Sequence, residues 1–111
     1  MNYSPTYFQK KVYQAVAQIP HGRVITYKEL ARAVGCNSPR AVGQALKKNP
    51  FAPDIPCHRV IASNLSIGGY KGETSDTAKE KKTALLEQEG VFFTAGTLKD
   101  ADKIFHFPGN K

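Results

Sequence analysis

Apolar residues recur every three or four positions near the start of the chain. Within residues 5–19 they fall on one face of an amphipathic helix, namely Phe8, Val12, Val16 and Ile19. The Pro-His-Gly sequence at residues 20–22 is expected to end this helix. The hydrophobic pattern therefore predicts a first helix over residues 5–19.

Two shorter helical patterns follow, each with its own start signal. Thr26 and Glu29 have the spacing of a reciprocal capping box at the start of a helix over residues 27–34. Ser38 as N-cap and Pro39 at the first position predict a third helix over residues 39–48. Its apolar face consists of Val42, Ala45 and Leu46. Two short helices joined by a glycine-containing turn form either a helix-turn-helix or an ordinary antiparallel pair.

In the second half of the chain, the pattern of residues predicts a small amount of β structure and one more helix. An apolar run at residues 59–63, a turn at 64–66 and a glycine-rich stretch at 67–72 suggest a small hairpin or wing. A last helix is expected over residues 77–89, with Gly90 as its left-handed C-cap. Residues 94–111 have no clear period and no predicted role. The fold class is therefore mainly α with a small β hairpin, in a single domain over residues 1–111.

Composition limits the classes of partner. The 111 residues lack any apolar run near the roughly 20 needed to span a bilayer, and the N-terminus lacks a signal-peptide stretch. An intracellular monomer without membrane contact is expected, in the cytoplasm of a prokaryote or the nucleus of a eukaryote. The formal net charge of +7 favours a polyanionic partner, above all nucleic acid.

The two cysteines are expected to be free thiols. A single disulfide between Cys36 and Cys57 is disfavoured in a chain without a secretory signal. The cysteines and histidines also lack the short spacing of a zinc knuckle. We therefore expect neither a metal nor a cofactor.

Cys57 lies in the stretch DIPCHRV, residues 54–60, directly before His58. A cysteine nucleophile usually needs a histidine partner, which in turn needs an orienting acceptor. Neighbours in an extended segment point to opposite sides, so contact requires a water or a sharp turn after Pro56. The carboxylates available to orient His58 are those of Glu87 and Glu89. The alternative interpretation is a buried structural cysteine beside a histidine bonded to backbone.

The combination of motifs is more specific than its parts. IPCHRV, preceded by SPRAVGQALKKNP and followed by GGYKG and LLEQEG, resembles the DNA-binding, active-site domain of the alkylguanine-DNA alkyltransferases. These are also called methylated-DNA-protein-cysteine methyltransferases, and the resemblance covers about residues 8–91. It implies a winged helix-turn-helix-like domain that binds double-stranded DNA containing O6-alkylguanine. It also implies a suicide methyltransferase, active once and without a cofactor.

The resemblance implies roles for four residues in the chemistry. Cys57 would be the thiolate that takes the alkyl carbon from guanine O6 and keeps it as a thioether. His58 would be its water-linked base, and Glu89 the carboxylate that orients His58. Tyr27 would contact the flipped base and assist protonation of the leaving guanine; without the family it is simply an aromatic residue in a first helical turn.

The resemblance also implies DNA-binding and pocket residues. Arg40 would enter the duplex and fill the gap left by the flipped nucleotide, since a thiol cannot reach a stacked base in line. The expected DNA-binding residues are Arg40, Tyr27, Ala41, Gly43, Gln44 and Lys47, approaching through the minor groove with little sequence preference and strong salt dependence. The expected pocket residues are Asn49, Pro56, Val60, Gly69, Tyr70 and Lys71. Asn49 would brace the active-site turn, and Lys71 stands where some relatives have a serine near the substrate oxygen.

Three other functions stay open. The chain has the short length of the alkyltransferase-like proteins, without the N-terminal domain of full-length relatives, and those proteins sense lesions without transfer and recruit excision-repair proteins. They typically carry tryptophan at the position of Cys57, so transfer is favoured here. A sequence-reading helix-turn-helix regulator would need more base-reading side chains than Gln44 alone. A cysteine hydrolase would need an oxyanion hole, and none is evident.

Overall fold

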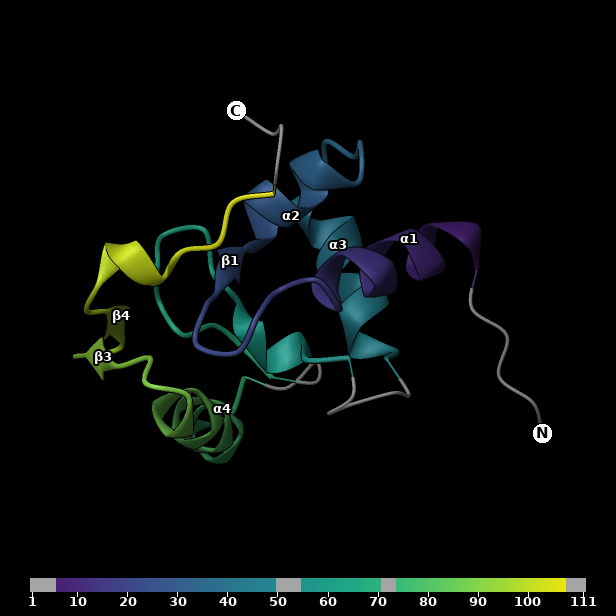
Figure 1. Cartoon of the computed structure of the whole chain (residues 1–111). Helices are drawn as coiled ribbons and strands as arrows, with labels where there is room; N and C mark the ends of the chain where they lie inside the picture. The colour runs from purple at the N-terminus through teal and green to yellow at the C-terminus, as the bar shows by residue number, and fades with distance from the viewer. Residues whose placement is uncertain (1–5, 50–54, 71–73, 108–111) are drawn as a thin grey trace.

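Four α-helices form most of the regular secondary structure in the computed structural model, which describes residues 6–49, 55–70 and 74–107 (Figure 1). The helices are α1 (Tyr7–Val16), α2 (Tyr27–Ala33), α3 (Pro39–Lys47) and α4 (Asp76–Gln88). Two short 3-10 helices, η1 (Cys57–Arg59) and η2 (Ala101–Lys103), lie in the second half. The four helices predicted from the hydrophobic pattern are confirmed, with ends that differ by a few residues.

Each α-helix begins at a side-chain N-cap. The hydroxyls of Thr6, Thr26, Ser38 and Ser75 each accept a hydrogen bond from the backbone amide three residues later. Such caps satisfy amides that have no partner inside the helix. The predicted cap at Thr26 is confirmed, but the carboxylate of Glu29 lies 3.3 Å from the guanidinium of Arg32 rather than bonding back to Thr26.

The strand after η1 does not pair as the sequence suggested. β2 (Val60–Ile61) was expected to form a hairpin with the residues that follow it. It instead pairs in parallel with β1 (Ile25–Thr26), with Ile25 opposite Val60. Both strands are buried throughout, and a continuous apolar run is typical of a strand covered on both faces. The chain then turns, with the amide of Ala62 donating to the carbonyl of Ser66, and Ser66 bridges to Thr97 instead of completing a hairpin with β2.

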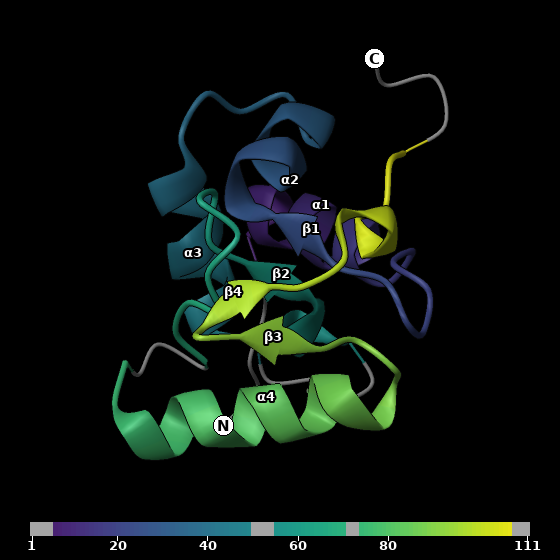
Figure 2. The ribbon, with the colours of Figure 1, turned by 90° about the vertical axis from the view of Figure 1, so that its left-hand side faces the viewer.

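The hairpin of the fold lies in the tail, for which no role was predicted. β3 (Phe93–Thr94) and β4 (Thr97–Leu98) pair antiparallel across a two-residue turn. Ala95 and Gly96 both have positive φ angles, 51° and 80°, as in a type I′ turn. Figure 2 shows α4 running beneath this hairpin. Ile104 then bridges to Val24, so the tail also borders the segment that leads into β1.

The core has two parts. The larger cluster joins α1, α2 and α3 around side chains that include Val12, Val16, Leu30, Val42 and Leu46. The smaller one lies between α4 and the hairpin and contains Val24, Ile61, Ile67, Leu86, Val91 and Leu98. Both clusters meet at β2, directly after η1, because Val60 belongs to the first and Ile61 to the second. Within the described residues, no helix is long and apolar enough to cross a membrane.

Candidate active site

Cys57 lies at the first position of η1, immediately after the buried Pro56. The sharp turn expected after Pro56 is thus a 3-10 turn, and only 6% of the Cys57 residue is exposed. The carbonyl of Ile55 accepts hydrogen bonds from the Cys57 amide at 2.8 Å and from Asn49 Nδ2 at 3.2 Å. Asn49, just beyond α3, therefore braces the turn that presents the thiol.

His58 and Glu89 are hydrogen-bonded although 31 residues separate them. His58 Nε2 lies 2.8 Å from Glu89 Oε2, and both side chains are less than 10% exposed. Of the two carboxylates considered from the sequence, Glu89 is the partner, because it sits at the C-cap of α4 and faces η1. With Nε2 donating to the carboxylate, the neutral ring keeps Nδ1 as its basic nitrogen.

Two further groups fix Glu89, and neither was expected from the sequence. Arg59 donates to it twice, from Nε to Oε1 at 2.8 Å and from Nη2 to Oε2 at 2.9 Å. Arg59 Nη1 also donates to the carbonyl of Ile19 after α1. The amide of Gly22 donates to Oε1 at 3.0 Å. Gly22 has a φ of +86°, and a Cβ there would lie 3.3 Å from the Glu89 carbonyl, so a side chain would strain this contact.

This network sets the charges of the pair. Burial alone would raise the pKa of Glu89, but the hydrogen bonds from Arg59, His58 and Gly22 outweigh it and lower that pKa to about 2. Burial lowers the pKa of His58, although Glu89 opposes the shift. At neutral pH the pair is therefore a carboxylate and a neutral imidazole, the form in which a histidine can take a proton.

Lys82 is the most unexpected member of the site. It lies on α4 directly after the exposed Lys81, yet its own exposure is 0%. Its ammonium donates to the carbonyl of Gly69 at 2.8 Å and stands 6.0 Å from the centre of the Tyr27 ring. Burial lowers the pKa of Lys82 to about 7, and the charge of Cys57 works in the opposite direction. The sequence contains conflicting indications for Lys82. Lysine is typical of an exposed position, but Lys82 is four residues from Ala78 and four from Leu86, in line with the buried face of the helix.

A cavity of about 210 Å³ opens beside the thiol. Its lining comes from α2, α3, η1 and the segment between β2 and α4, and comprises Tyr27, Gly43, Leu46, Lys47, Cys57, Gly69 and Thr74. Burial raises the pKa values of Tyr27 and Tyr70, with a smaller contribution from the charge of Cys57. Both phenols are therefore protonated at neutral pH and can donate a proton. An added Cβ at Gly43 would be 4.0 Å from the Tyr27 ring, so this face of α3 lies close to the cavity.

The other predicted site residues differ in their exposure and in the element that carries them. Arg40 and Gln44 are exposed on α3 and Ala41 is half-buried there, on the helix that also lines the cavity. Val60, expected to wall the pocket, is fully buried opposite Ile25 in the sheet. Lys71 lies outside the described residues.

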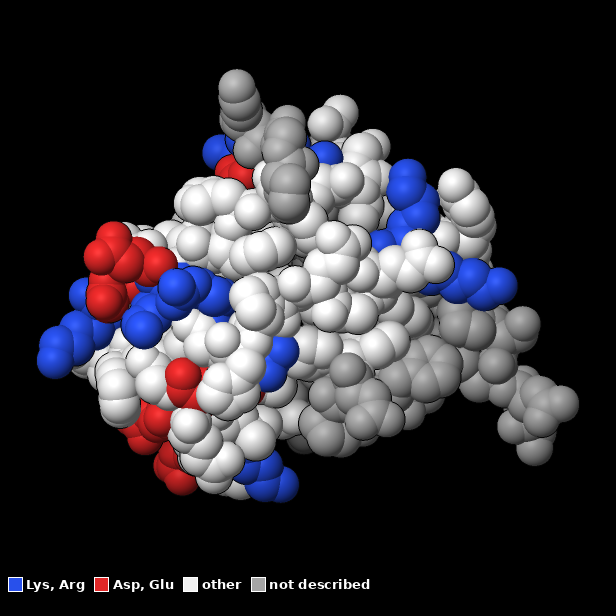
Figure 3. Space-filling view, in the orientation of Figure 1, with Lys and Arg blue, Asp and Glu red and all other residues white. Residues whose placement is uncertain are grey.

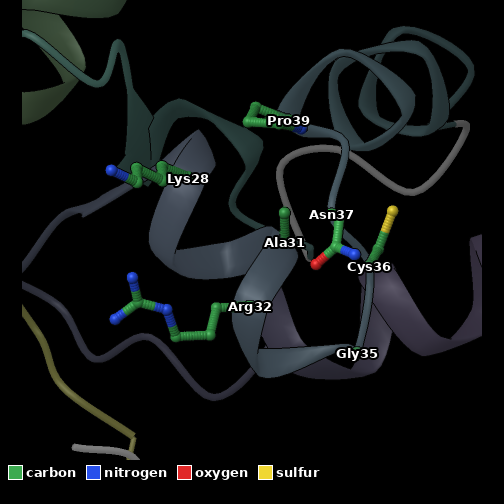
Figure 4. A pocket seen from close by; sticks show the side chains of 7 residues that line it. All are labelled: Lys28, Ala31, Arg32, Gly35, Cys36, Asn37 and Pro39. Atoms are coloured by element: carbon green, nitrogen blue, oxygen red, sulfur yellow. The ribbon is translucent and has the colours of Figure 1, made fainter.

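The site gathers several acid-base groups. Across the described ranges, no group of three or more His, Cys, Asp or Glu side chains is close enough to hold a metal ion. Cys36, the other cysteine, lies in the turn between α2 and α3 and lines a separate hollow (Figure 4). The arrangement can therefore supply a buried thiol with a fixed neutral histidine, two phenols and one ammonium.

Known proteins are similar to this chain over most of its length. Residues 7–91 match the family model described as 6-O-methylguanine DNA methyltransferase, DNA binding domain. A methylated-DNA–protein-cysteine methyltransferase of Saccharolobus solfataricus is 52% identical over 84 residues, which is 76% of this chain and 51% of that protein. The chain thus spans about half the length of the curated relatives it matches.

Solved structures agree in fold. S. pombe Atl1, in complex with damaged DNA containing O6-carboxymethylguanine, superposes with a TM-score of 0.74 at 36% identity, covering 90% of this chain and 95% of that one. Mycobacterium tuberculosis OGT in complex with DNA gives a TM-score of 0.71 at 39% identity, over 80% and 52% of the two chains. The predicted winged-helix-like fold class is thereby confirmed. The chain belongs to the 6-O-methylguanine DNA methyltransferase family, through that family's DNA-binding domain.

Proposed function

We propose that this protein repairs O6-alkylguanine in duplex DNA by moving the alkyl group irreversibly to its own Cys57. One observation carries the proposal: the thiol lies at a cavity and is backed by the His58–Glu89 pair, which is buried and 2.8 Å apart. The curated relatives named methylated-DNA–protein-cysteine methyltransferase support it. A structural cysteine would need neither a fixed neutral histidine nor an adjacent cavity.

The transfer step balances with the groups present. His58 takes the thiol proton through a water, and the Cys57 thiolate attacks the alkyl carbon. A carbon–sulfur bond forms as the bond from carbon to guanine O6 breaks, and the electron pair stays on guanine. The leaving guanine takes a proton from Tyr27, whose raised pKa keeps it protonated until then. The thioether product is stable, so each molecule acts once.

The charge distribution supports DNA as the partner. Residues 1–49 contain eight Lys and Arg and one Glu, whereas residues 50–111 contain eight Lys and Arg and eight Asp and Glu. The whole net charge of +7 therefore belongs to the half of the chain that holds α1, α2 and α3. Figure 3 shows the acidic side chains gathered mainly at the side of α4 and the segment after β4. A field of this kind attracts a polyanion to the face that carries α3.

Lesion sensing without transfer is the second candidate, because the similarity to S. pombe Atl1 covers nearly the whole of both chains. In that case the protein would bind O6-alkylguanine and recruit excision-repair proteins. The presence of Cys57 with His58 favours transfer. The two functions differ in one measurable product.

The test is the mass of the tryptic peptide that spans residues 49–59 and contains Cys57. After incubation with a duplex containing O6-methylguanine, that peptide should gain one methylene, and the Cys57→Ala variant should gain none. The peptide spanning residues 33–40, which contains Cys36, serves as an internal control and should stay unmodified. If the protein binds the lesion tightly but the mass of the Cys57 peptide does not change, its function is lesion sensing and not alkyl transfer.

Arg40→Ala should slow alkyl transfer from duplex DNA far more than transfer from the free alkylguanine base. Arg40 is exposed on α3, and its proposed role is to fill the gap left by the flipped nucleotide. Without it, more of the unstacking cost, a few kcal/mol, is left uncompensated, whereas a free base needs no flipping. The measurement is the ratio of the two transfer rates in wild type and variant. Equal losses on both substrates would rule out the flipping role.

A further inference from the structure

The chain continues beyond the matched family model and returns to the helical core. The match ends at residue 91, and no role was predicted for residues 94–111. After η2, residues 103–107 form a terminal segment that runs beside the residues leading into β1, drawn in yellow in Figure 1. The terminal segment therefore contacts the half of the chain that contains α2 and Tyr27.

Backbone hydrogen bonds attach the terminal segment to Val24, the residue directly before β1. The Val24 amide donates to the carbonyl of Lys103 at 2.9 Å, and the Phe105 amide donates to the carbonyl of Val24 at 2.7 Å. Val24 is fully buried, and Ile104 is its partner in a parallel bridge. The terminal segment thus holds both polar groups of the Val24 backbone, while the next residues pair with β2.

The side chains of the terminal segment join the two parts of the core. Ile104 packs against the cluster that contains Val24 and Ile61. Phe105 and Phe107 pack against the larger cluster of α1, α2 and α3. Their rings meet edge to face, with centres 5.0 Å apart and planes at 75°. All three side chains are partly buried, so the terminal segment covers the core from outside.

The backbone held by the terminal segment leads directly to a wall of the Cys57 cavity. Val24 is followed by the two residues of β1, and the second of these, Thr26, is also the N-cap of α2. The next residue, Tyr27, lines the cavity. No loop separates Val24 from Tyr27, so a displacement of one is passed to the other. An acid must lie within hydrogen-bond reach of the atom it protonates, and a shift of about 1 Å already lowers the rate strongly.

We propose that the terminal segment is a positioning element for alkyl transfer, in which Phe105 and Phe107 hold the junction of β1 and α2. The Tyr27 phenol then stays in place to protonate the leaving guanine. This inference rests on the proposed function, in which Tyr27 gives that proton. Neither phenylalanine lines the Cys57 cavity, so their effect on transfer must pass through another residue.

The first test is the rate of methyl transfer from duplex O6-methylguanine to Cys57 at saturating DNA. Phe105→Ala/Phe107→Ala should lower this rate by about tenfold, because the acid is displaced. The control Phe92→Ala removes a phenylalanine that is 51% exposed and lies outside the terminal segment, and it should transfer at the wild-type rate. A wild-type rate in the double variant would overturn the proposal.

Circular dichroism and denaturant unfolding establish that the compared proteins are folded at the assay temperature. If the double variant does not fold, Phe107→Ala takes its place, and the same outcomes decide.

A double-mutant cycle with Tyr27→Phe separates positioning from a general loss of structure. Tyr27→Phe removes the phenol proton. In that background the Phe105→Ala/Phe107→Ala change should slow transfer by less than about twofold, because the proton donor it acts on is already absent. Equal slowing in both backgrounds would overturn the proposal, since the effect would then not pass through Tyr27.

A spectroscopic readout does not depend on transfer. The NMR signals of the Tyr27 ring, assigned by their absence in Tyr27→Phe, should move in the double variant and stay unchanged in Phe92→Ala. Unchanged Tyr27 signals in the double variant would overturn the proposal. If the wild type forms no thioether, the proposed function fails, whereas this comparison still decides whether the terminal segment positions Tyr27.

Discussion

Glu89→Gln should slow alkyl transfer to Cys57 by about 100-fold or more and lower the free energy of unfolding by about 3 to 5 kcal/mol. The Glu89 carboxylate accepts from Arg59 twice, from the Gly22 amide and from His58. A neutral amide cannot accept all four bonds, and it leaves the Arg59 charge partly buried without a counter-ion. It also no longer holds His58 in the tautomer that leaves Nδ1 free to accept a proton.

Glu87→Gln is the matched control for this change. Glu87 is exposed on the same helix, two residues earlier, and has the same chemistry. Its substitution should change the free energy of unfolding by no more than about 0.5 kcal/mol and leave the transfer rate unaltered. Similar losses in both variants would show that the Glu89 network is not what activates Cys57.

Acid titration gives the Glu89 prediction a second readout. The folded pKa of Glu89 is about 2 and lies below its ordinary value of 4.5, so the folded state favours the charged form. The resulting stability is present above pH 4.5 and is lost as the pH falls from about 4.5 to about 2. Glu89→Gln should lack this part of the acid destabilisation. Denaturant unfolding of both proteins at pH 7, 4.5 and 3 measures the difference.

Lys82→Met should slow alkyl transfer at neutral pH by about tenfold or more, since each 1.4 kcal/mol of lost interaction is a factor of ten. The protonated amine attracts the Cys57 thiolate and holds the Gly69 carbonyl at the cavity wall. Methionine has similar length and fills the space, but it provides neither the charge nor the donor. The exposed neighbour gives the control: Lys81→Met should transfer at the wild-type rate.

The stability of the Lys82 variant should depend on pH in a distinctive way. The folded pKa of about 7 lies below the ordinary 10.5, so between these values the unfolded chain binds a proton that the folded protein does not. Unfolding of the wild type therefore becomes harder as the pH rises from about 7 to about 10.5, by up to about 1.4 kcal/mol per pH unit. Lys82→Met should lack this rise. If the free energies of unfolding of the two proteins change with pH in parallel, Lys82 is not buried as an amine in the folded protein.

Local signals in the sequence predicted the helices well. The N-caps at Thr26 and Ser38 depend on a few neighbouring residues and are found where the pattern placed them. Gly90 has the left-handed φ that was predicted, one position beyond the C-cap Glu89. The turn at Ala95-Gly96 carried a hairpin signal of the same local kind, a glycine between short β-prone pairs, although no hairpin was predicted there. Short-range chemistry thus accounts for nearly all of the predicted helix boundaries.

Long-range contacts were harder to predict. The pairing of β2 with β1 joins Val60 to Ile25, and nothing in either strand specifies that partner. Lys82 is buried because a distant backbone carbonyl, that of Gly69, accepts its hydrogen bond. Lysine is otherwise almost always exposed, so the residue type alone favours an exposed position for Lys82. The His58–Glu89 bond was expected only through the family resemblance, since spacing along the chain does not determine it.

The order in which the site residues occur along the chain controls when Cys57 becomes reactive during synthesis. Cys57 leaves the ribosome before Lys82 and Glu89, and both of these belong to α4 or its C-cap. Until α4 packs against η1, His58 has no carboxylate to fix its tautomer and the thiol has no ammonium beside it. A nascent chain therefore carries an ordinary cysteine, and the proposed alkyl transfer would have to wait for the completed fold.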